Sequence, residues 1–177
     1  MLLEMRVFGL AIDPLTNAPI VILKDAEDKN VLPIWIGPLE ASAIATELEK
    51  IQLSRPMTHD LLRDIFKNLA ITVSKVAITN LEDNVYYAAI HLIYGENSYA
   101  IDARPSDAIA VALRTNSPIF VENKVLEKSK NIDIGKRSFA SKGHQKDDRL
   151  DSEGDKQAEW LDVLTNLSSE NFGKYKM

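Results

Sequence analysis

The chain of 177 residues has no cysteine, few glycines and prolines (7 of each), and only 7% aromatic residues. Without cysteine it can form no disulfide bond, no thiolate zinc site and no cysteine nucleophile. No apolar run approaches the roughly 20 residues of a membrane-spanning helix. The opening MLLEMRVFGLAIDP is too short and too charged for a signal peptide. We therefore expect a cytoplasmic protein with no membrane association.

Hydrophobic residues make up 45% of the chain, which excludes a fully disordered protein, and the net charge of −5 is unevenly distributed. Residues 1–126 hold 16 acidic and 11 basic side chains, whereas residues 127–177 hold 10 of each. An acidic body argues against binding nucleic acid through bulk charge, but it allows a locally basic or metal-bridged site. Just after residue 126, basic side chains gather at Lys128, Lys130, Lys136, Arg137, Lys142 and Lys146.

Composition divides the chain into three parts. Residues 1–126 have the apolar content of a folded domain. In residues 127–158 about half the side chains are charged and apolar ones are isolated, which predicts a polar linker or solvated excursion. Residues 159–177 regain helical spacing through Trp160, Leu161 and Leu164, which predicts a short C-terminal helix and tail.

The first part resembles itself when it is shifted by 67 positions, so that residues 2–53 align with residues 69–120. Pro38 then falls on Pro105, and both begin the pattern Pro-x-[Glu/Asp]-Ala-x-Ala-[Ile/Val]-Ala. Two asparagine pairs match at the same offset, namely Asn17 with Asn84 and Asn30 with Asn97. We interpret this as an internal duplication.

Each repeat is predicted to form three strands and one helix. The strands are expected near residues 3–11, 19–23 and 31–36, and near 71–79, 85–93 and 98–102. The helices begin at Pro38 and Pro105, because proline suits the first helical turn. Turns are expected at residues 13–17 and 80–84, a further helix from Thr58, and a last strand over 118–121. The prediction is an α+β domain of duplicated β-β-β-α units, with helices packed on curved mixed sheets.

Three predicted helix starts carry polar side chains suited to a reaction. They are Trp35–Glu40, Arg55–Asp60 and Asp102–Asp107. Helix N-termini present unpaired N–H groups and a partial positive charge, which favour phosphate. Arg55 and Arg104 each precede a proline and could bind a phosphate with two hydrogen bonds. The helix dipole should keep His59 neutral, so that it is available as a base or metal ligand.

The same residues also have a purely structural interpretation. Ordinary helix capping uses the residue types found at Thr58, Asp60, Ser106 and Asp107. Arg104 could form a structural salt bridge with Asp102 or Asp107. Residue types alone do not separate these alternatives.

Longer motifs occur in a fixed order: LPIWIG at 32–37, Glu40–Ala41, RPMTHDLL at 55–62 and IDARPSDA at 101–108. Together they resemble the bifunctional nuclease family, formerly a domain of unknown function, over residues 1–127. The ending NFGKY at 171–175 resembles the tails of bacterial members. The resemblance implies hydrolysis of both DNA and RNA, the activity credited to plant members. Its motif positions fall on Glu40, Arg55, His59, Asp60, Asp102, Arg104 and Asp107.

Our first hypothesis is a nuclease that hydrolyses phosphodiester bonds in DNA and RNA with little sequence preference, helped by Mg²⁺ or Mn²⁺. The candidate catalytic residues are His59, Asp60, Asp102, Arg104 and Asp107. The candidate substrate-binding residues are Arg55, Ser106, Lys128, Lys130, Lys136 and Arg137. The candidate metal ligands are Glu40, Asp102 and Asp107.

The second hypothesis is a non-catalytic module for binding or oligomeric assembly, in which the Arg/Asp motifs are structural. The repeats and apolar strands fit self-association, so a homo-oligomer is expected. The two hypotheses differ in one structural feature. Catalytic residues should share an accessible site, whereas a structural network should be buried and paired internally.

Overall fold

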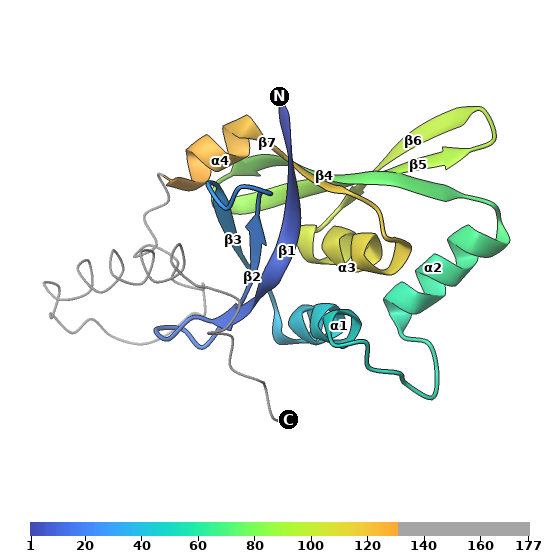
Figure 1. Ribbon diagram of the computed structural model, residues 1–177, viewed down its shortest axis with the longest axis horizontal. Coiled ribbons are helices and arrows are strands. Elements are labelled where there is room, and N and C mark those ends of the chain that lie inside the picture. Colours follow the sequence, from blue (N-terminus) through green and yellow to red (C-terminus); the bar gives the residue numbers. More distant parts are fainter. Residues whose placement is uncertain (131–177) are drawn as a thin grey trace, which may run out of the picture. The chain divides into compact units, whose positions relative to one another are not determined.

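Residues 1–130, the part of the chain that the computed structural model describes, contain seven strands and four helices (Figure 1). The strands are β1 (Leu2–Ile12), β2 (Pro19–Lys24), β3 (Val31–Trp35), β4 (Thr72–Glu82), β5 (Val85–Tyr94), β6 (Asn97–Ala103) and β7 (Ile119–Glu122). The helices are α1 (Pro38–Leu48), α2 (Thr58–Asn68), α3 (Pro105–Thr115) and α4 (Asn123–Lys130). The predicted α+β class is confirmed.

All seven strands form one mixed sheet in the order β3-β2-β1-β7-β4-β5-β6. Strands β1, β2 and β3 are antiparallel neighbours, and so are β4, β5 and β6. Between these two groups, β7 runs antiparallel to β1 and parallel to β4. Each group of three is followed by a helix, α1 or α3, that begins with a proline. The order of elements thus repeats, while the duplication of the sequence stays a prediction.

Burial of side chains explains where the helices lie. All six residues of β2, the neighbour of edge strand β3, are buried, so both faces of the sheet are covered at this strand. Helix α3 packs against α1, α2, β4 and β5, and its alanines allow close approach. Helices α1, α2 and α3 lie on one face of the sheet, which we call the helix face, and α4 lies on the other (Figure 1). No helix within residues 1–130 is long and apolar enough to cross a membrane.

The turn between β4 and β5 is shorter than predicted. The turn expected over 80–84 contains only Asp83 and Asn84, because Leu81 still pairs with Tyr86 across β4 and β5. Both turn residues have positive φ, which suits a two-residue hairpin turn. Helix α4 spans residue 126, where the predicted domain ends: Val125 and Leu126 are buried, and the helix continues to Lys130.

The polar excursion expected after residue 130 and the helix and tail expected over 159–177 lie outside the described residues. The proposed division of that part of the chain therefore stays a prediction.

Replacing Ile109 with alanine should lower the free energy of unfolding by about 2–5 kcal/mol, because the fully buried side chain of α3 would leave a cavity against the sheet. Urea denaturation measures this change. Leu39→Ala is the control: the side chain is 83% exposed, and the change should stay within about 0.5 kcal/mol. Equal losses in both variants would contradict this account of the core.

Candidate functional site

The starts of α1 and α3 meet at the side chain of Arg104. The residue before a proline favours extended backbone, and Arg104 has φ −68° and ψ 146° immediately before α3. Its Nη1 donates to Oε1 of Glu40 in α1 at 2.8 Å. Its Nε and Nη2 donate to Oδ2 and Oδ1 of Asp107 at 2.7 and 3.2 Å. One guanidinium therefore bridges two carboxylates from different helices.

The start of α2 joins the same cluster through His59. Its Nε2 lies 3.1 Å from Oδ1 of Asp107, so the Asp107 carboxylate is shared between a histidine and an arginine. We call Glu40, His59, Arg104 and Asp107 the helix-start group. The sequence predicted the last three as catalytic residues and the first as a metal ligand. The structure brings all four together.

Hydrogen bonding and charge shift the pKa of Asp107 and that of Arg104. Burial acts to raise the pKa of Asp107, but hydrogen bonds from Arg104 and His59, together with their charges, hold that pKa below its ordinary value. The hydrogen bonds and charge of Asp107, followed by Glu40, raise the pKa of Arg104. Two carboxylates and one guanidinium give a net charge of −1 when His59 is neutral. The Arg104 side chain is nonetheless 65% exposed, so solvent and ligands can reach it.

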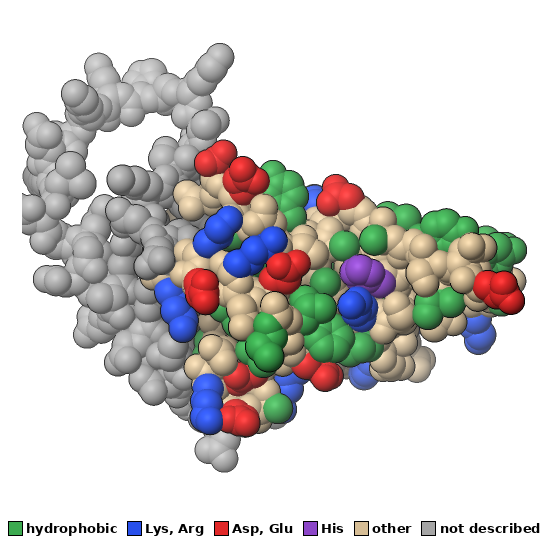
Figure 2. Space-filling view, turned by 90° about the horizontal axis from the view of Figure 1, so that it is seen from above, with side chains coloured by type: hydrophobic (Ala, Val, Ile, Leu, Met, Phe, Trp, Pro, Cys, Tyr) green, Lys and Arg blue, Asp and Glu red, His purple; other side chains and the backbone are tan. Residues whose placement is uncertain are grey.

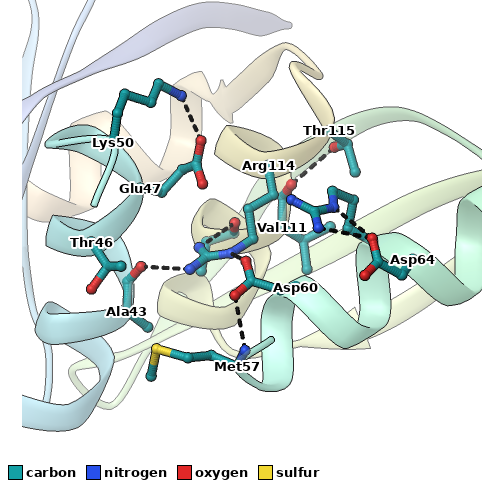
Figure 3. Close-up of polar contacts among 12 residues, drawn as sticks. Ala43, Thr46, Glu47, Lys50, Met57, Asp60, Asp64, Val111, Arg114 and Thr115 are labelled. Atoms are coloured by element: carbon teal, nitrogen blue, oxygen red, sulfur yellow. Dashed lines mark hydrogen bonds and ion pairs between the residues drawn. The ribbon is translucent and has the colours of Figure 1, made fainter. Parts of the chain in front are cut away.

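Arg114, near the end of α3, forms a different cluster. Its side chain is only 1% exposed. Figure 3 shows its guanidinium between α1 and α2. The Nε donates to Oδ1 of Asp60 at 2.6 Å, and Nη1 and Nη2 donate to the carbonyl oxygens of Ala110 and Ala43 at 3.1 Å each. Arg114 thus links all three helices of the helix face.

Asp60, a predicted catalytic residue, is held by this cluster. Its second oxygen, Oδ2, accepts a hydrogen bond from the backbone N–H of Met57 at 2.9 Å. Burial acts to raise the pKa of Asp60, but the Met57 and Arg114 hydrogen bonds outweigh it and the pKa is lowered. Sequence analysis missed Arg114. The signal available in the sequence was a basic residue on an otherwise apolar stripe of the helix. Arg114 follows the buried Val111 by three positions and the buried Ala110 by four.

Asp102 is not brought into the helix-start group. It pairs with Ala89 across β5 and β6, whereas the neighbouring Ala88 and Ile90 are buried on the helix face. Because successive side chains of a strand alternate, Asp102 lies on the opposite face of the sheet. It is exposed, and no side chain among residues 1–130 pairs with it.

The predicted substrate-binding residues are spread over the structure. Arg55 is exposed in the loop before α2, without an ion-pair partner in the described part of the chain, while Ser106 is buried in the first turn of α3. Lys128 lies in α4, on the face opposite α3, where its Nζ donates to the carbonyl oxygen of Leu81 at 2.9 Å. Lys130 ends the same helix. Lys136 and Arg137 lie outside the described residues.

The predicted metal ligands do not form a set in this arrangement. Within residues 1–130 there is no group of three His, Asp or Glu side chains placed to hold a metal ion. Arg104 lies between the carboxylates of Glu40 and Asp107, so a cation already bridges them. Arg104 takes Oε1 of Glu40 and leaves Oε2 for another ligand.

Gly37 allows Glu40 to fold back toward Arg104. A Cβ at residue 37 would overlap Oε2 of Glu40, because the Glu40 carboxylate lies against the glycine. Gly37 has φ −75° and ψ 161°, a conformation that any residue can adopt. The absence of a side chain at this position therefore matters for the site and not for the backbone.

The fold and the helix-start group define an α+β domain with an accessible arginine held by acidic side chains and a histidine. The model of the bifunctional nuclease domain matches residues 21–133, and the chain belongs to that family. The predicted resemblance is thus confirmed.

Three relatives illustrate the range of similarity. An uncharacterized protein of Mycobacterium tuberculosis is 42% identical over 123 residues, covering 70% of this chain and 73% of that protein. Bifunctional nuclease 2 of Arabidopsis thaliana is 32% identical over 114 residues, covering 61% of this chain and 34% of its own length. Bifunctional nuclease 1 of Oryza sativa subsp. japonica is 26% identical over 112 residues, covering 62% of this chain and 34% of that protein. The chain spans about a third of these plant proteins.

Replacing Gly37 with alanine should leave the free energy of unfolding within about 1 kcal/mol of the wild type, because the backbone conformation suits alanine. The new methyl group should displace the Glu40 carboxylate and break its bond to Arg104. A crystal structure of the variant should show Arg104 bound to Asp107 alone. An intact Glu40–Arg104 hydrogen bond would contradict this role of the glycine.

Replacing Arg114 with methionine should lower the free energy of unfolding by about 3–5 kcal/mol at pH 7, because the Asp60 side chain, only 18% exposed, would lose its charged partner. The lowered pKa of Asp60 stabilises the folded state above the ordinary value of 3.8, and this contribution is lost as the pH falls through the folded-state pKa. The difference in the free energy of unfolding between variant and wild type, measured by urea denaturation, should therefore be smaller near pH 3 than at pH 7.

Arg63→Met is the matched control, since Arg63 is a partly exposed arginine of α2 paired with Asp64. The free energy of unfolding of this variant should be lower than that of the wild type by less than about 1 kcal/mol. Equal destabilisation of both variants, or a difference from wild type that does not change with pH, would show that the Arg114–Asp60 pair does not hold the helices together.

Proposed function

We propose that this protein is a nuclease that hydrolyses phosphodiester bonds in DNA and RNA with little sequence preference. Membership of the bifunctional nuclease family and similarity to plant proteins named as bifunctional nucleases support the reaction class. The observation that carries the proposal is the helix-start group, in which an exposed arginine and a histidine share the carboxylate of Asp107. These are side chains that phosphodiester hydrolysis can use.

Arg104 is the proposed phosphate clamp. A guanidinium has five N–H groups, and three of them donate to Glu40 and Asp107. The remaining two can donate to phosphate oxygens as negative charge develops on them. Because both carboxylates hold the guanidinium in place, it needs little reorganisation when the substrate binds.

His59 is the proposed general base. When Nε2–H donates to Oδ1 of Asp107, the lone pair of Nδ1 is free to accept a proton. A water molecule would attack phosphorus as its proton passes to Nδ1, and the bond from phosphorus to the leaving sugar oxygen would break. That oxygen would take a proton from solvent. Asp107 would stabilise the imidazolium that forms.

The net charge of the helix-start group supports a role for Mg²⁺ or Mn²⁺. At −1, the group opposes an approaching phosphate unless further positive charge is supplied. Oε2 of Glu40 and oxygens of the substrate are the ligands we propose for a divalent cation, since Mg²⁺ is commonly held by one or two carboxylates and by phosphate. Bound there, it would neutralise charge on the phosphate.

We propose further nucleic-acid contacts outside the helix-start group. Arg55 is exposed shortly before His59 in the chain, and a phosphate next to the cleaved one could bind it. Lys128, Lys130, Lys136 and Arg137 form a basic segment that could hold the nucleic-acid backbone whatever its sequence. Within residues 1–130 the side chains of Asp102 and Ser106 form no hydrogen bond or ion pair, and we assign them no step in this reaction.

The alternative is a non-catalytic module in which Arg104 is structural. It is favoured by the fact that, within residues 1–130, all three hydrogen bonds donated by the Arg104 side chain go to the carboxylates of Glu40 and Asp107. The two functions differ in what the loss of Arg104 removes: hydrolysis in one case, and only local stability in the other.

Arg104→Ala should lower the rate of hydrolysis of single-stranded DNA, duplex DNA and RNA by about 10²–10³-fold. His59→Gln should lower it by about 10²–10⁴-fold. Both rate losses are measured from initial rates with Mg²⁺, with Mn²⁺ and with EDTA. Activity should be lost in EDTA. Arg6→Ala is the matched control, because Arg6 is also ion-paired with a carboxylate and its side chain is 64% exposed.

The control should retain wild-type rates, and all variants should keep the wild-type melting temperature within a few degrees. Hydrolysis that survives Arg104→Ala as well as Arg6→Ala would place the active site elsewhere. Absence of hydrolysis by the wild type under all metal conditions would favour the non-catalytic module. Undiminished activity in EDTA would remove the metal from the proposal.

A further inference from the structure

The two edges of the sheet differ in their protection against pairing with another strand. Edge strand β3 has five residues and contains Pro33, which cannot donate a backbone hydrogen bond. Edge strand β6 has seven residues, with neither proline nor glycine nor a basic side chain, and all but the last are exposed. A long, exposed edge of this kind is a template for strand addition.

Hydrophobic side chains accompany the outer edge of β6, which pairs with no strand within residues 1–130. The hairpin of β5 and β6 rises away from the helices (Figure 1), and β6 is an edge strand of the sheet. Tyr99 and Ile101 are each 47% exposed, and they pair with Leu92 and Ile90 of β5. Figure 2 views the sheet from the side opposite α1, α2 and α3, and hydrophobic side chains are visible along the same end of the molecule there too. The edge therefore offers both hydrogen-bonding groups and apolar surface.

We propose that β6 pairs antiparallel with β6 of a second copy of this chain, around a twofold axis at Ala100, and joins the two sheets into one. This register overlaps all seven residues of the strand, from Asn97 opposite Ala103 to Ala103 opposite Asn97. A twofold rotation about an axis normal to the sheet does not exchange the two faces of the sheet. The helices α1, α2 and α3 of both copies would therefore lie on the same face of the joined sheet. The interface is isologous and closes as a dimer.

The side chains of β6 are complementary to themselves in this register. Tyr99 of each copy lies opposite Ile101 of the other, a favourable aromatic and β-branched pair on the helix face. On the other face, Ser98 lies opposite Asp102, where a hydroxyl can donate to a carboxylate. Asp102 is the only charged residue of β6. A shift that set Asp102 opposite itself would bring two negative charges together.

Charges beyond both ends of β6 match in the same register. Glu96 precedes the strand and Arg104 follows it, and the two fall opposite each other across the axis, twice in the dimer. Arg104 is 65% exposed, so its outer side is open to the second copy. This charge complementarity and the self-complementary strand favour a second copy over an unrelated strand. The dimer does not depend on the nuclease activity.

A cysteine at Ala100 tests the axis directly, because the chain has no cysteine of its own. Paired residues in antiparallel strands have Cα atoms about 4.5–5.5 Å apart, within the range of a disulfide. Full-length Ala100→Cys, oxidised with copper phenanthroline, should run mainly as a covalent dimer on a non-reducing gel. Reduction should return it to the monomer.

Ser98→Cys is the matched control on the same strand and the same face. In the proposed register the two thiols that it introduces come from residues about 13 Å apart along the strands, too far for a disulfide. This variant should stay monomeric on the gel. Equal cross-linking of both variants, or none at Ala100, would overturn the proposed register and axis.

Oligomeric state in solution provides the second test. Light scattering on the eluting wild type should give twice the chain mass of 19.8 kDa. Ile101→Lys should give the monomer mass with an unchanged circular dichroism spectrum, because it places a charge in the apolar pair. Val85→Lys, on β5 and 53% exposed, should remain a dimer. A monomeric wild type, or a dimer that survives Ile101→Lys, would overturn the proposal.

Discussion

The buried guanidinium of Arg114 is the constraint on which the candidate site depends. A charge with 1% exposure must be paired and hydrogen-bonded, and Arg114 finds its partners on all three helices of the helix face. Asp60 is bound to it from the first turn of α2, so the rotation of that helix is determined. His59 is the neighbouring residue in the same turn, and this rotation lets it reach Asp107. The structural ion pair thus positions the proposed base.

Burial separates the roles of Arg104, which precedes α3, and Arg114, which lies near the end of that helix. Arg114 directs its guanidinium into the protein, where every partner stabilises the packing of helices. Arg104, just before Pro105, is held by two carboxylates but remains 65% exposed. Residue type and charge are the same in both cases. Of the two, only Arg104 has N–H groups that a phosphate can reach. The proposed chemistry is therefore assigned to the start of α3 and not to its end.

Sequence patterns predicted most of the fold because they are local. Alternating apolar residues marked the strands, and Pro38 and Pro105 marked two helix starts that the structure confirms. The turn at Asp83 and Asn84 was placed too broadly, since two-residue turns with positive φ are set by the pairing of β4 with β5. Asp102 was grouped with Asp107 because they are close in sequence. The alternation of β6 puts Asp102 on the other face of the sheet.

By itself, the sequence determined the α+β class, the family and the residue types at the three helix starts, because these follow from periodicity, proline positions and contiguous motifs. The tertiary structure alone decided which of those residues meet. Glu40 and Arg104 are 64 positions apart, and His59 and Asp107 are 48 apart. Such contacts are set by the packing of α1, α2 and α3 around Arg114. A local pattern carries no information about distances of that kind, because they depend on how whole elements pack.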